Sequence, residues 1–233
     1  MKNVLLASTS TLYGGQYLGY LQNEIRDLFN NIKELLFIPY ARPSGISCEA
    51  YTFKVKSFFN MLDIDVAGLE NFDDPLAALQ EAQAVFTGGG NTFLLVKTMY
   101  EFNLFPALKA RIEQGMPYLG ASAGSNIAGI NMKTTNDMPI VYPPSFNCMG
   151  IVPFNINPHY LDPDPRIQHN GETRETRIKE FLTQNDTPVI GLREGSWLRL
   201  LHGDIKLEGF HSCRVFEKHN IPYELEPGVL PFK

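Results

Sequence analysis

The segment 120–124 reads Gly-Ala-Ser-Ala-Gly, which places a hydroxyl nucleophile, Ser122, between small residues in the pattern Gly-x-Ser-x-Gly. An apolar pair at 118–119 precedes it, and we predict a helix over about 124–130 after it. A tight turn from a strand into a helix exposes such a serine, and small neighbours let the turn pack closely. The N–H groups at the start of the helix would face an anion formed on a substrate. Ser122 is therefore a candidate nucleophile, although tight turns without chemistry share this pattern.

A serine nucleophile needs a base that takes its proton and an acid that orients the base. The chain has five histidines: His159, His169, His202, His211 and His219. We favour His159, because it follows an Asn-Pro pair shortly after a strand expected near 150–152, and ligand sites in open α/β sheets lie at such strand ends. For the acid we favour Asp137, which lies in a polar loop before a short apolar run. On local grounds alone, however, the sequence around Asp137 favours an Asx turn before Pro139.

Three glycines, Gly88, Gly89 and Gly90, stand where we expect a strand to end and a helix to begin. Their freedom of conformation lets a backbone approach a ligand closely and turn its N–H groups inward. One interpretation is an oxyanion hole, completed by the N–H of Ala123. The others are a phosphate cradle and a plain turn at a helix start. The dinucleotide-binding pattern fails because Phe93 stands where its third glycine is required, and the P-loop pattern lacks Gly-Lys-Ser/Thr.

The elements that must position these residues follow from the hydrophobic pattern. We predict strands at 3–7, 34–39, 64–68, 84–87 and 117–121, and helices at 17–29, 48–62, 74–83, 92–100 and 105–114. Their alternation favours a three-layer α/β fold with a mostly parallel sheet flanked by helices. Beyond Ser122 we expect long loops over 136–164, a helix at 173–183 and short strands at 189–192, 197–201, 205–207 and 213–217. This predicts a single α/β domain over 1–233 with a partly antiparallel C-terminal third.

Composition excludes several classes of function. The chain has 233 residues and a formal net charge of −5, which argues against a nucleic-acid-binding face. No apolar run approaches the length of a membrane span. Three scattered cysteines, Cys48, Cys148 and Cys213, show no zinc pattern and fit a reducing cytoplasm. We therefore expect a cytoplasmic protein with no nucleic-acid or membrane partner, and either a monomer or a homodimer.

Eight stretches, taken together and in order, resemble the peptidase E family, the aspartyl dipeptidases among the serine peptidases. They cover nearly the whole chain: FIPY (37–40), DPLAA (74–78), GGGNTF (88–93), GASAGSN (120–126), TTNDMPIV (134–141), INPH (156–159), GETRETRI (171–178) and VIGLREGSW (189–197). The resemblance implies a class I glutamine-amidotransferase-like fold, with serine in place of that superfamily's cysteine. It also implies hydrolysis of small aspartyl peptides, dipeptides with an N-terminal aspartate, without a metal or cofactor.

The resemblance also implies roles for single residues. Ser122 matches the nucleophile, His159 the base and Asp137 the orienting acid. Gly89 or Gly90, together with Ala123, matches the donors of the oxyanion hole.

For the substrate, the resemblance implies that Arg174 meets the aspartyl carboxylate. A guanidinium suits this role because it binds a carboxylate through two charge-assisted hydrogen bonds. Arg177, three residues further along the expected helix, is a second candidate, and Asn91 is a further candidate for substrate binding. Both arginines could instead pair with nearby glutamates in solvent.

Two departures from the family pattern, Ala121 and Tyr142, keep a second hypothesis open. In it the same three catalytic residues belong to a cyanophycinase-like β-aspartyl peptidase or an esterase. A third hypothesis is a binding protein that holds a small anion at the glycine turn 88–90.

Overall fold

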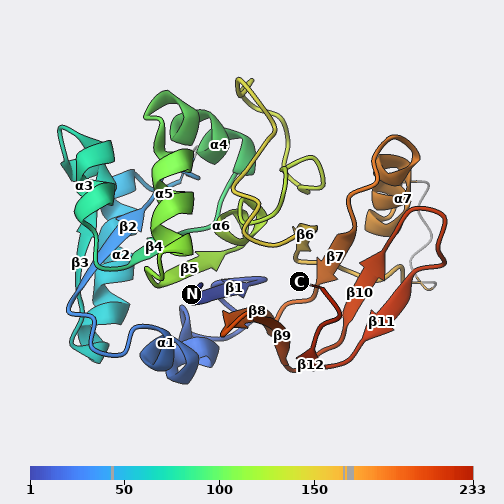
Figure 1. The fold of residues 1–233 in the computed structure, drawn as a ribbon, viewed down its shortest axis with the longest axis horizontal. Coiled ribbons are helices and arrows are strands. Elements are labelled where there is room, and N and C mark those ends of the chain that lie inside the picture. Colours follow the sequence, from blue (N-terminus) through green and yellow to red (C-terminus); the bar gives the residue numbers. More distant parts are fainter. Residues whose placement is uncertain (43–44, 165, 167–170, 233) are drawn as a thin grey trace.

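The computed structural model describes residues 1–42, 45–164, 166 and 171–232. Their strands form an eight-stranded sheet and a separate four-stranded sheet (Figure 1). The larger sheet has the order β12-β9-β8-β1-β5-β4-β2-β3. Its strands are β1 (Val4–Ala7), β2 (Glu34–Ile38), β3 (Asp65–Gly68), β4 (Val85–Thr87), β5 (Tyr118–Ala121), β8 (Ser196–Leu201), β9 (Asp204–Gly209) and β12 (Gly228–Val229).

The strands β1 to β5 of this sheet run parallel, and β8, β9 and β12 extend it as antiparallel neighbours. The predicted α/β class and mostly parallel sheet are confirmed. The helices are α1 (Gln22–Leu28), α2 (Cys48–Phe59), α3 (Pro75–Glu81), α4 (Thr92–Glu101), α5 (Leu104–Glu113), α6 (Ala123–Asn126) and α7 (Arg174–Gln184), with short 3-10 turns at Gly19–Leu21, Asn60–Leu62 and Leu69–Asn71. Several helices are shorter than predicted. The differences are largest for the 17–29 pattern, which forms a 3-10 turn followed by α1, and for the 124–130 pattern, which forms only α6.

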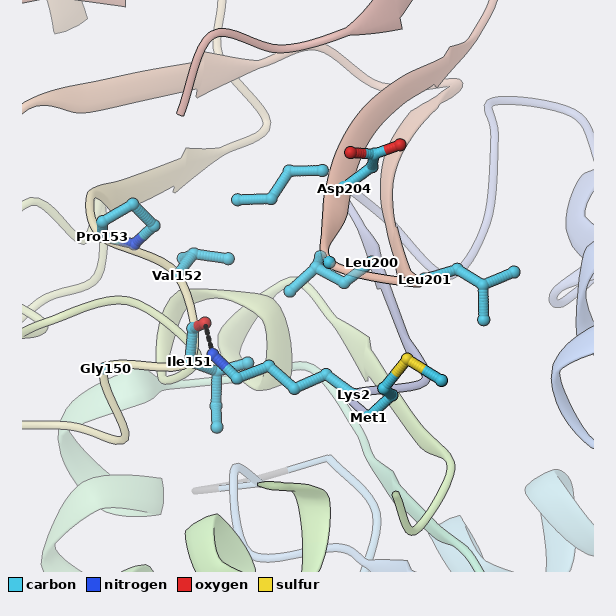
Figure 2. Close-up of a pocket in the computed structure, with 11 residues that line it drawn as sticks. Met1, Lys2, Gly150, Ile151, Val152, Pro153, Leu200, Leu201 and Asp204 are labelled. Carbon is cyan, nitrogen blue, oxygen red and sulfur yellow. Dashed lines mark hydrogen bonds between the residues drawn. The ribbon is translucent and has the colours of Figure 1, made fainter. Parts of the chain in front are cut away.

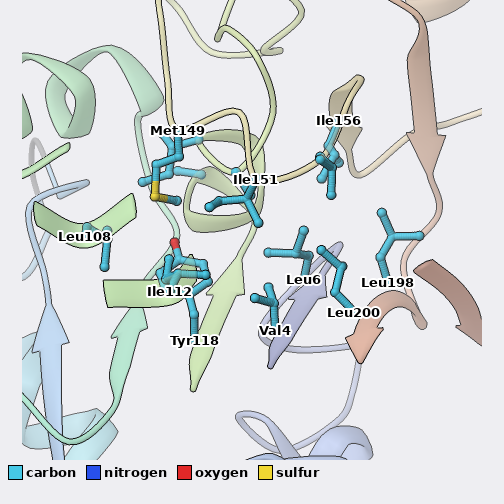
Figure 3. Close-up of a cluster of buried hydrophobic side chains, with 14 of the residues drawn as sticks. Val4, Leu6, Leu108, Ile112, Tyr118, Met149, Ile151, Ile156, Leu198 and Leu200 are labelled. Atoms are coloured by element: carbon cyan, nitrogen blue, oxygen red, sulfur yellow. The ribbon is translucent and has the colours of Figure 1, made fainter. Parts of the chain in front are cut away.

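Alternating side chains of the central strands fill two hydrophobic cores, one on each face of the sheet. Val4 and Leu6 of β1 pack into the core beneath α3, α4 and α5 (Figure 3). Leu5 and Ala7 point the other way, into the core shared with α1 and α2. Successive strand residues point to opposite faces, so a strand covered on both sides is apolar throughout, as β1 is. Three layers result, and the C-terminal ends of the parallel strands are left at one edge.

The four-stranded sheet has the order β11-β10-β7-β6 and packs with α7 on the opposite side of the molecule from α2 and α3 (Figure 1). Its strands are β6 (Asn155–Pro158), β7 (Val189–Leu192), β10 (Cys213–Phe216) and β11 (Tyr223–Leu225). β6 falls inside the predicted long loop, and residues 150–152, predicted to be a strand, are irregular. The strands β6, β11 and β12 were not predicted.

Within the described part of the chain, no helix is both long enough and apolar enough to cross a membrane.

Candidate active site

Ser122 occupies the turn that leads from β5 into α6. Its backbone has φ 54° and ψ −109°, a positive-φ conformation that non-glycine residues adopt only when their surroundings enforce it. The small neighbours predicted for this turn are required by its packing. A Cβ on Gly120 would lie 2.6 Å from the Gly124 carbonyl oxygen, and a Cβ on Gly124 would lie 2.1 Å from the Thr87 carbonyl oxygen. The turn therefore holds the hydroxyl at the C-terminal edge of the sheet.

His159 directly follows β6, and its ring reaches across to the serine. Its Nε2 lies 2.8 Å from Ser122 Oγ. The backbone of His159 also has a positive φ, 53°, so a second residue of the site is held in a conformation that a side chain disfavours. The structure thus brings together the two residues that the sequence placed first for nucleophile and base.

Glu194 completes this line of contacts. Its Oε1 lies 2.6 Å from His159 Nδ1, the ring nitrogen that faces away from the serine. A carboxylate at this nitrogen accepts its proton in a hydrogen bond, and leaves Nε2 free to accept the proton of the serine hydroxyl. The sequence analysis did not identify Glu194. A signal for it was present, because Glu194 lies two residues after the predicted strand 189–192, and His159 was likewise chosen because it follows a predicted strand.

Asp137, the acid expected from the sequence, is engaged at another element. Its Oδ2 accepts a 2.7 Å hydrogen bond from the Thr92 backbone N–H and a 2.9 Å bond from the Thr135 hydroxyl. Because Thr92 is the first residue of α4, the carboxylate satisfies an unpaired donor at a helix N-terminus. The structure does not bring Asp137 to His159, and Glu194 stands in its place.

The glycine turn after β4 lies against the nucleophile. A Cβ on Gly89 would come 2.9 Å from Ser122 Cβ. The Gly89 N–H donates to the Tyr51 hydroxyl at 3.1 Å, so this donor is already occupied. The N–H groups of Gly90 and Ala123 donate to no other described residue. Of the three predicted oxyanion donors, Gly90 and Ala123 are therefore the two that remain available.

The two candidate arginines differ in their surroundings. Arg174, the first residue of α7, is partly buried, and its Nη1 donates a long 3.4 Å hydrogen bond to the Pro158 carbonyl. Burial lowers the pKa of Arg174, an effect that the nearby charge of Glu194 opposes. Arg177 is exposed, and its Nε lies 3.6 Å from Glu172 Oε2. Arg174 is thus a desolvated cation beside His159, whereas Arg177 forms the solvent pair considered from the sequence.

Asn91 has a structural task. Its Oδ1 accepts the Leu94 N–H at 3.0 Å, and its Nδ2 donates to the Met138 carbonyl at 2.9 Å. The side chain therefore caps α4 and holds the loop that contains Asp137, with both ends of its amide used. This arrangement does not favour the predicted role in substrate binding.

Other candidate positions lie away from these contacts. His202, His211 and His219 belong to turns of the β8–β11 region, and His169 lies outside the described residues.

A hollow of about 370 Å³ opens near the N-terminus, between Lys2, Ile151 and Leu200 (Figure 2). It lies at the start of β1, and its described lining holds no serine, cysteine or histidine, so it offers none of the chemistry found at the opposite ends of the strands.

Comparison with known proteins gives a consistent result. The model of peptidase family S51 matches residues 4–208. A protein named peptidase E from Streptomyces coelicolor is 48% identical over 226 residues, which cover 97% of this chain and 92% of that protein. A probable alpha-aspartyl dipeptidase from Drosophila melanogaster is 43% identical over 229 residues, which cover 97% of this chain and 94% of that protein.

Solved structures share the fold at lower sequence identity. A peptidase from an acI-B1 Actinobacterium superimposes with a TM-score of 0.71 at 18% identity, over 97% of this chain and 94% of that one. A putative peptidase E protein from Listeria monocytogenes EGD-e gives a TM-score of 0.68, also at 18% identity, over 91% of this chain and 100% of that one.

Proposed function

Because the chain belongs to peptidase family S51, we propose that it is a serine dipeptidase that hydrolyses dipeptides with an N-terminal aspartate. One observation carries the chemistry: Ser122 Oγ, the His159 ring and Glu194 Oε1 are joined by contacts of 2.8 Å and 2.6 Å. The name of the Drosophila relative, an alpha-aspartyl dipeptidase, supports the choice of substrate.

In the first half of the reaction, Ser122 Oγ attacks the carbonyl carbon of the aspartyl residue. His159 Nε2 takes the hydroxyl proton as the bond forms. Glu194 orients the ring through Nδ1 and stabilises the positive charge that the ring then carries. The carbonyl oxygen becomes an oxyanion, and the N–H groups of Gly90 and Ala123 are its proposed donors. Loss of one such donor typically costs about 3 kcal/mol of transition-state stabilisation.

In the second half, the protonated His159 gives its proton to the leaving amine, and the C–N bond breaks. The aspartyl group remains on Ser122 as an ester. A water molecule, deprotonated by His159, then attacks this ester and releases aspartate, and Ser122 recovers its proton. The same imidazole thus serves both halves of the cycle.

Arg174 is the proposed partner of the substrate's side-chain carboxylate. A partly buried guanidinium that forms no ion pair with the described residues has lost hydration without gaining a carboxylate in direct contact, although the charge of Glu194 lies nearby. A substrate carboxylate would supply that charge. A neutral side chain would leave the guanidinium unpaired, so the site should discriminate strongly between aspartate and its uncharged analogues.

The alternative functions gain no support. The relatives named as peptidase E and alpha-aspartyl dipeptidase favour α-aspartyl dipeptides over β-aspartyl peptides or esters. A pure anion-binding protein would have no need of the aligned serine, histidine and glutamate. Three free cysteines, Cys48, Cys148 and Cys213, support a cytoplasmic location as part of this proposal.

The function is tested by measuring hydrolysis of Asp-Leu, Asn-Leu and Ala-Leu by the wild type and by Ser122→Ala. We expect cleavage of Asp-Leu only, and its loss in the variant. Equal cleavage by both proteins would remove Ser122 from the mechanism, and equal rates on all three peptides would remove the aspartyl preference.

The role of Arg174 is tested by Arg174→Gln, with Arg177→Gln as the matched control on the same helix. A hydrogen-bonded charge contributes about 1.5–3 kcal/mol, so kcat/KM for Asp-Leu should fall about 10- to 100-fold in the first variant. The preference for Asp-Leu over Asn-Leu should fall with it. The control should stay within about threefold of the wild type, because Arg177 is exposed and already paired. The reverse pattern would assign the carboxylate to Arg177.

A further inference from the structure

The proposed catalytic groups come from two different sheets. Ser122 follows β5 of the eight-stranded sheet, whereas His159 and Glu194 follow β6 and β7 of the four-stranded sheet. The 2.8 Å contact between serine and histidine therefore depends on how the two sheets are held together at this edge.

One buried hydroxyl joins the sheets at this point. Ser8 is the first residue after β1, and its side chain is completely buried. Its Oγ donates to the Leu192 carbonyl oxygen at 2.8 Å and accepts the His159 backbone N–H, also at 2.8 Å. Leu192 is the last residue of β7, two positions before Glu194. The same hydroxyl thus holds the start of both loops that carry the base and its acid.

Ser8 also lies beside the nucleophile turn. Ala7 of β1 is in register with Ala121 of β5, so the residues that follow them, Ser8 and Ser122, are neighbours at the ends of adjacent strands. The Ser122 N–H donates to the Ala7 carbonyl at 3.1 Å. In Figure 1 the arrow of β1 points from the larger sheet toward β6 and β7, which agrees with these bonds.

The bond to Ser8 matters because of the conformation of His159. At φ 53° the histidine backbone is strained, and such a conformation persists only where the surroundings fix it. Its N–H is bound by Ser8, and the next N–H, of Tyr160, donates to the same Leu192 carbonyl at 3.1 Å. Without the hydroxyl, the His159 N–H loses its partner and the ring loses one of the bonds that set its direction.

We propose that Ser8 is a positioning residue for the reaction: its hydroxyl aligns the His159 ring with Ser122 by bridging the ends of β1, β6 and β7. The inference rests on the proposed function for the reaction that Ser8 would assist. The hydrogen bonds of Ser8 do not depend on that function. Because small misplacements of a catalytic group reduce rates strongly, removal of the hydroxyl should reduce kcat more than it changes KM.

The test compares Ser8→Ala with Ser196→Ala. Ser196 is a matched control, because it is also completely buried and its hydroxyl also bridges a backbone N–H and carbonyl, both of His211, at 3.0 Å. For Ser8→Ala we expect kcat on Asp-Leu to fall about 10- to 100-fold with KM within threefold of wild type. For Ser196→Ala we expect a comparable loss of thermal stability but kcat within threefold of wild type. If Ser8→Ala does not fold, Ser8→Cys, whose thiol is a weaker donor and acceptor, should show a smaller loss of the same kind.

A double-mutant cycle separates positioning from general damage. In the His159→Ala background, Ser8→Ala should change the residual rate less than twofold, because there is no ring left to position. The proposal would be overturned if Ser8→Ala reduced the rate by the same factor in the wild-type and His159→Ala backgrounds. It would also be overturned if kcat of Ser8→Ala stayed within threefold of wild type.

The rate at which a fluorophosphonate labels Ser122 gives a readout that does not need the natural substrate. It should fall in Ser8→Ala as kcat does. If wild type were labelled but did not cleave Asp-Leu, the proposed function would fail while the role of Ser8 could still be tested in this way. Equal labelling of wild type and Ser8→Ala would overturn the role of Ser8 alone.

Discussion

Replacement of Glu194 by glutamine removes one charge from the line of contacts at the active site and leaves its size almost unchanged. The carboxylate oxygen lies 2.6 Å from His159 Nδ1. In the transition state the ring carries a positive charge, because it has taken the proton of Ser122. The glutamine oxygen can still accept the Nδ1 proton, but it provides no negative charge beside the ring.

The size of this effect follows from Coulomb's law and the exposure of the pair. The His159 and Glu194 side chains are 34% and 42% exposed, so the effective dielectric constant lies above that of a protein interior. With about 4 Å between the charge centres, an effective dielectric constant of about 20 gives roughly 4 kcal/mol, and one of about 40 gives roughly 2 kcal/mol. Since about 1.4 kcal/mol corresponds to a factor of ten in rate, we expect kcat of Glu194→Gln to be roughly 30- to 1,000-fold lower than that of the wild type.

The assay is steady-state hydrolysis of Asp-Leu by Glu194→Gln, with Asp137→Asn measured in parallel. KM should change little in Glu194→Gln, because the carboxylate acts on the ring. Asp137→Asn changes a carboxylate that caps α4, so it should lower the thermal stability. Any effect on kcat should be indirect, through a shift of the Gly90–Asn91 turn that precedes this helix. Activity of Glu194→Gln within threefold of wild type would refute Glu194 as the orienting acid.

Two further predictions concern stability. Gly124→Ala should lower the free energy of unfolding by about 3 kcal/mol or more in chemical denaturation, because its Cβ would lie 2.1 Å from the Thr87 carbonyl oxygen; a loss below about 1 kcal/mol would contradict the close packing of this turn. Burial alone would raise the pKa of Glu224, but hydrogen bonds from Arg193, Ser212 and Arg214 lower it to about 2. A lowered carboxyl pKa stabilises the folded state above the unfolded value of about 4.5, and this stabilisation is lost as the pH falls toward about 2. Glu224→Gln should therefore be about 1 kcal/mol less stable at pH 7, after allowance for solvent screening. The gap should close between pH 4.5 and 2 in thermal melts, and a gap that is constant with pH would disagree with this account.

The nucleophile turn could be predicted from the sequence because its signals are local. An apolar strand, a serine between small residues and a helix start occupy one short segment, and the structure shows why the glycines are required. The same holds for the alternating strands and helices of the first half, where burial on both faces makes the central strands β1 and β5 apolar throughout.

β6 could not be found in this way because its burial does not depend on apolar side chains alone. Asn155 and Asn157 are buried. Asn155 Nδ2 donates a hydrogen bond to Asn131 Oδ1, and Asn157 Nδ2 donates to the Thr134 carbonyl and to Asn136 Oδ1. Their polar sequence is typical of a loop, and hydropathy therefore predicts one.

The missed strand explains the missed acid. β6 pairs in parallel with β7, and this register places Pro158 beside Leu192, so the residues just beyond the two strands meet. Without β6, nothing in the sequence connects His159 to a glutamate 35 residues further along the chain. Asp137 was favoured for its polar loop, but such loops also supply carboxylates that cap helices, and the Thr92 N–H is its partner here.

The division of the site between two sheets also bears on how the protein should tolerate change. Ser122 is held by the central parallel strands, whose cores lie on both faces of the larger sheet. His159 and Glu194 follow strands of the smaller sheet, one face of which packs on the cluster of Tyr160, Ile178, Leu182, Val189 and Phe216. The other face, with Ile156, Ile190 and Leu192, belongs to the same core as Val4 and Leu6 of the larger sheet. Because this core is continuous across the two sheets, they should unfold together, and activity should be lost at the same denaturant concentration as the fluorescence signal of the folded protein. Loss of activity at a clearly lower concentration would contradict a shared core.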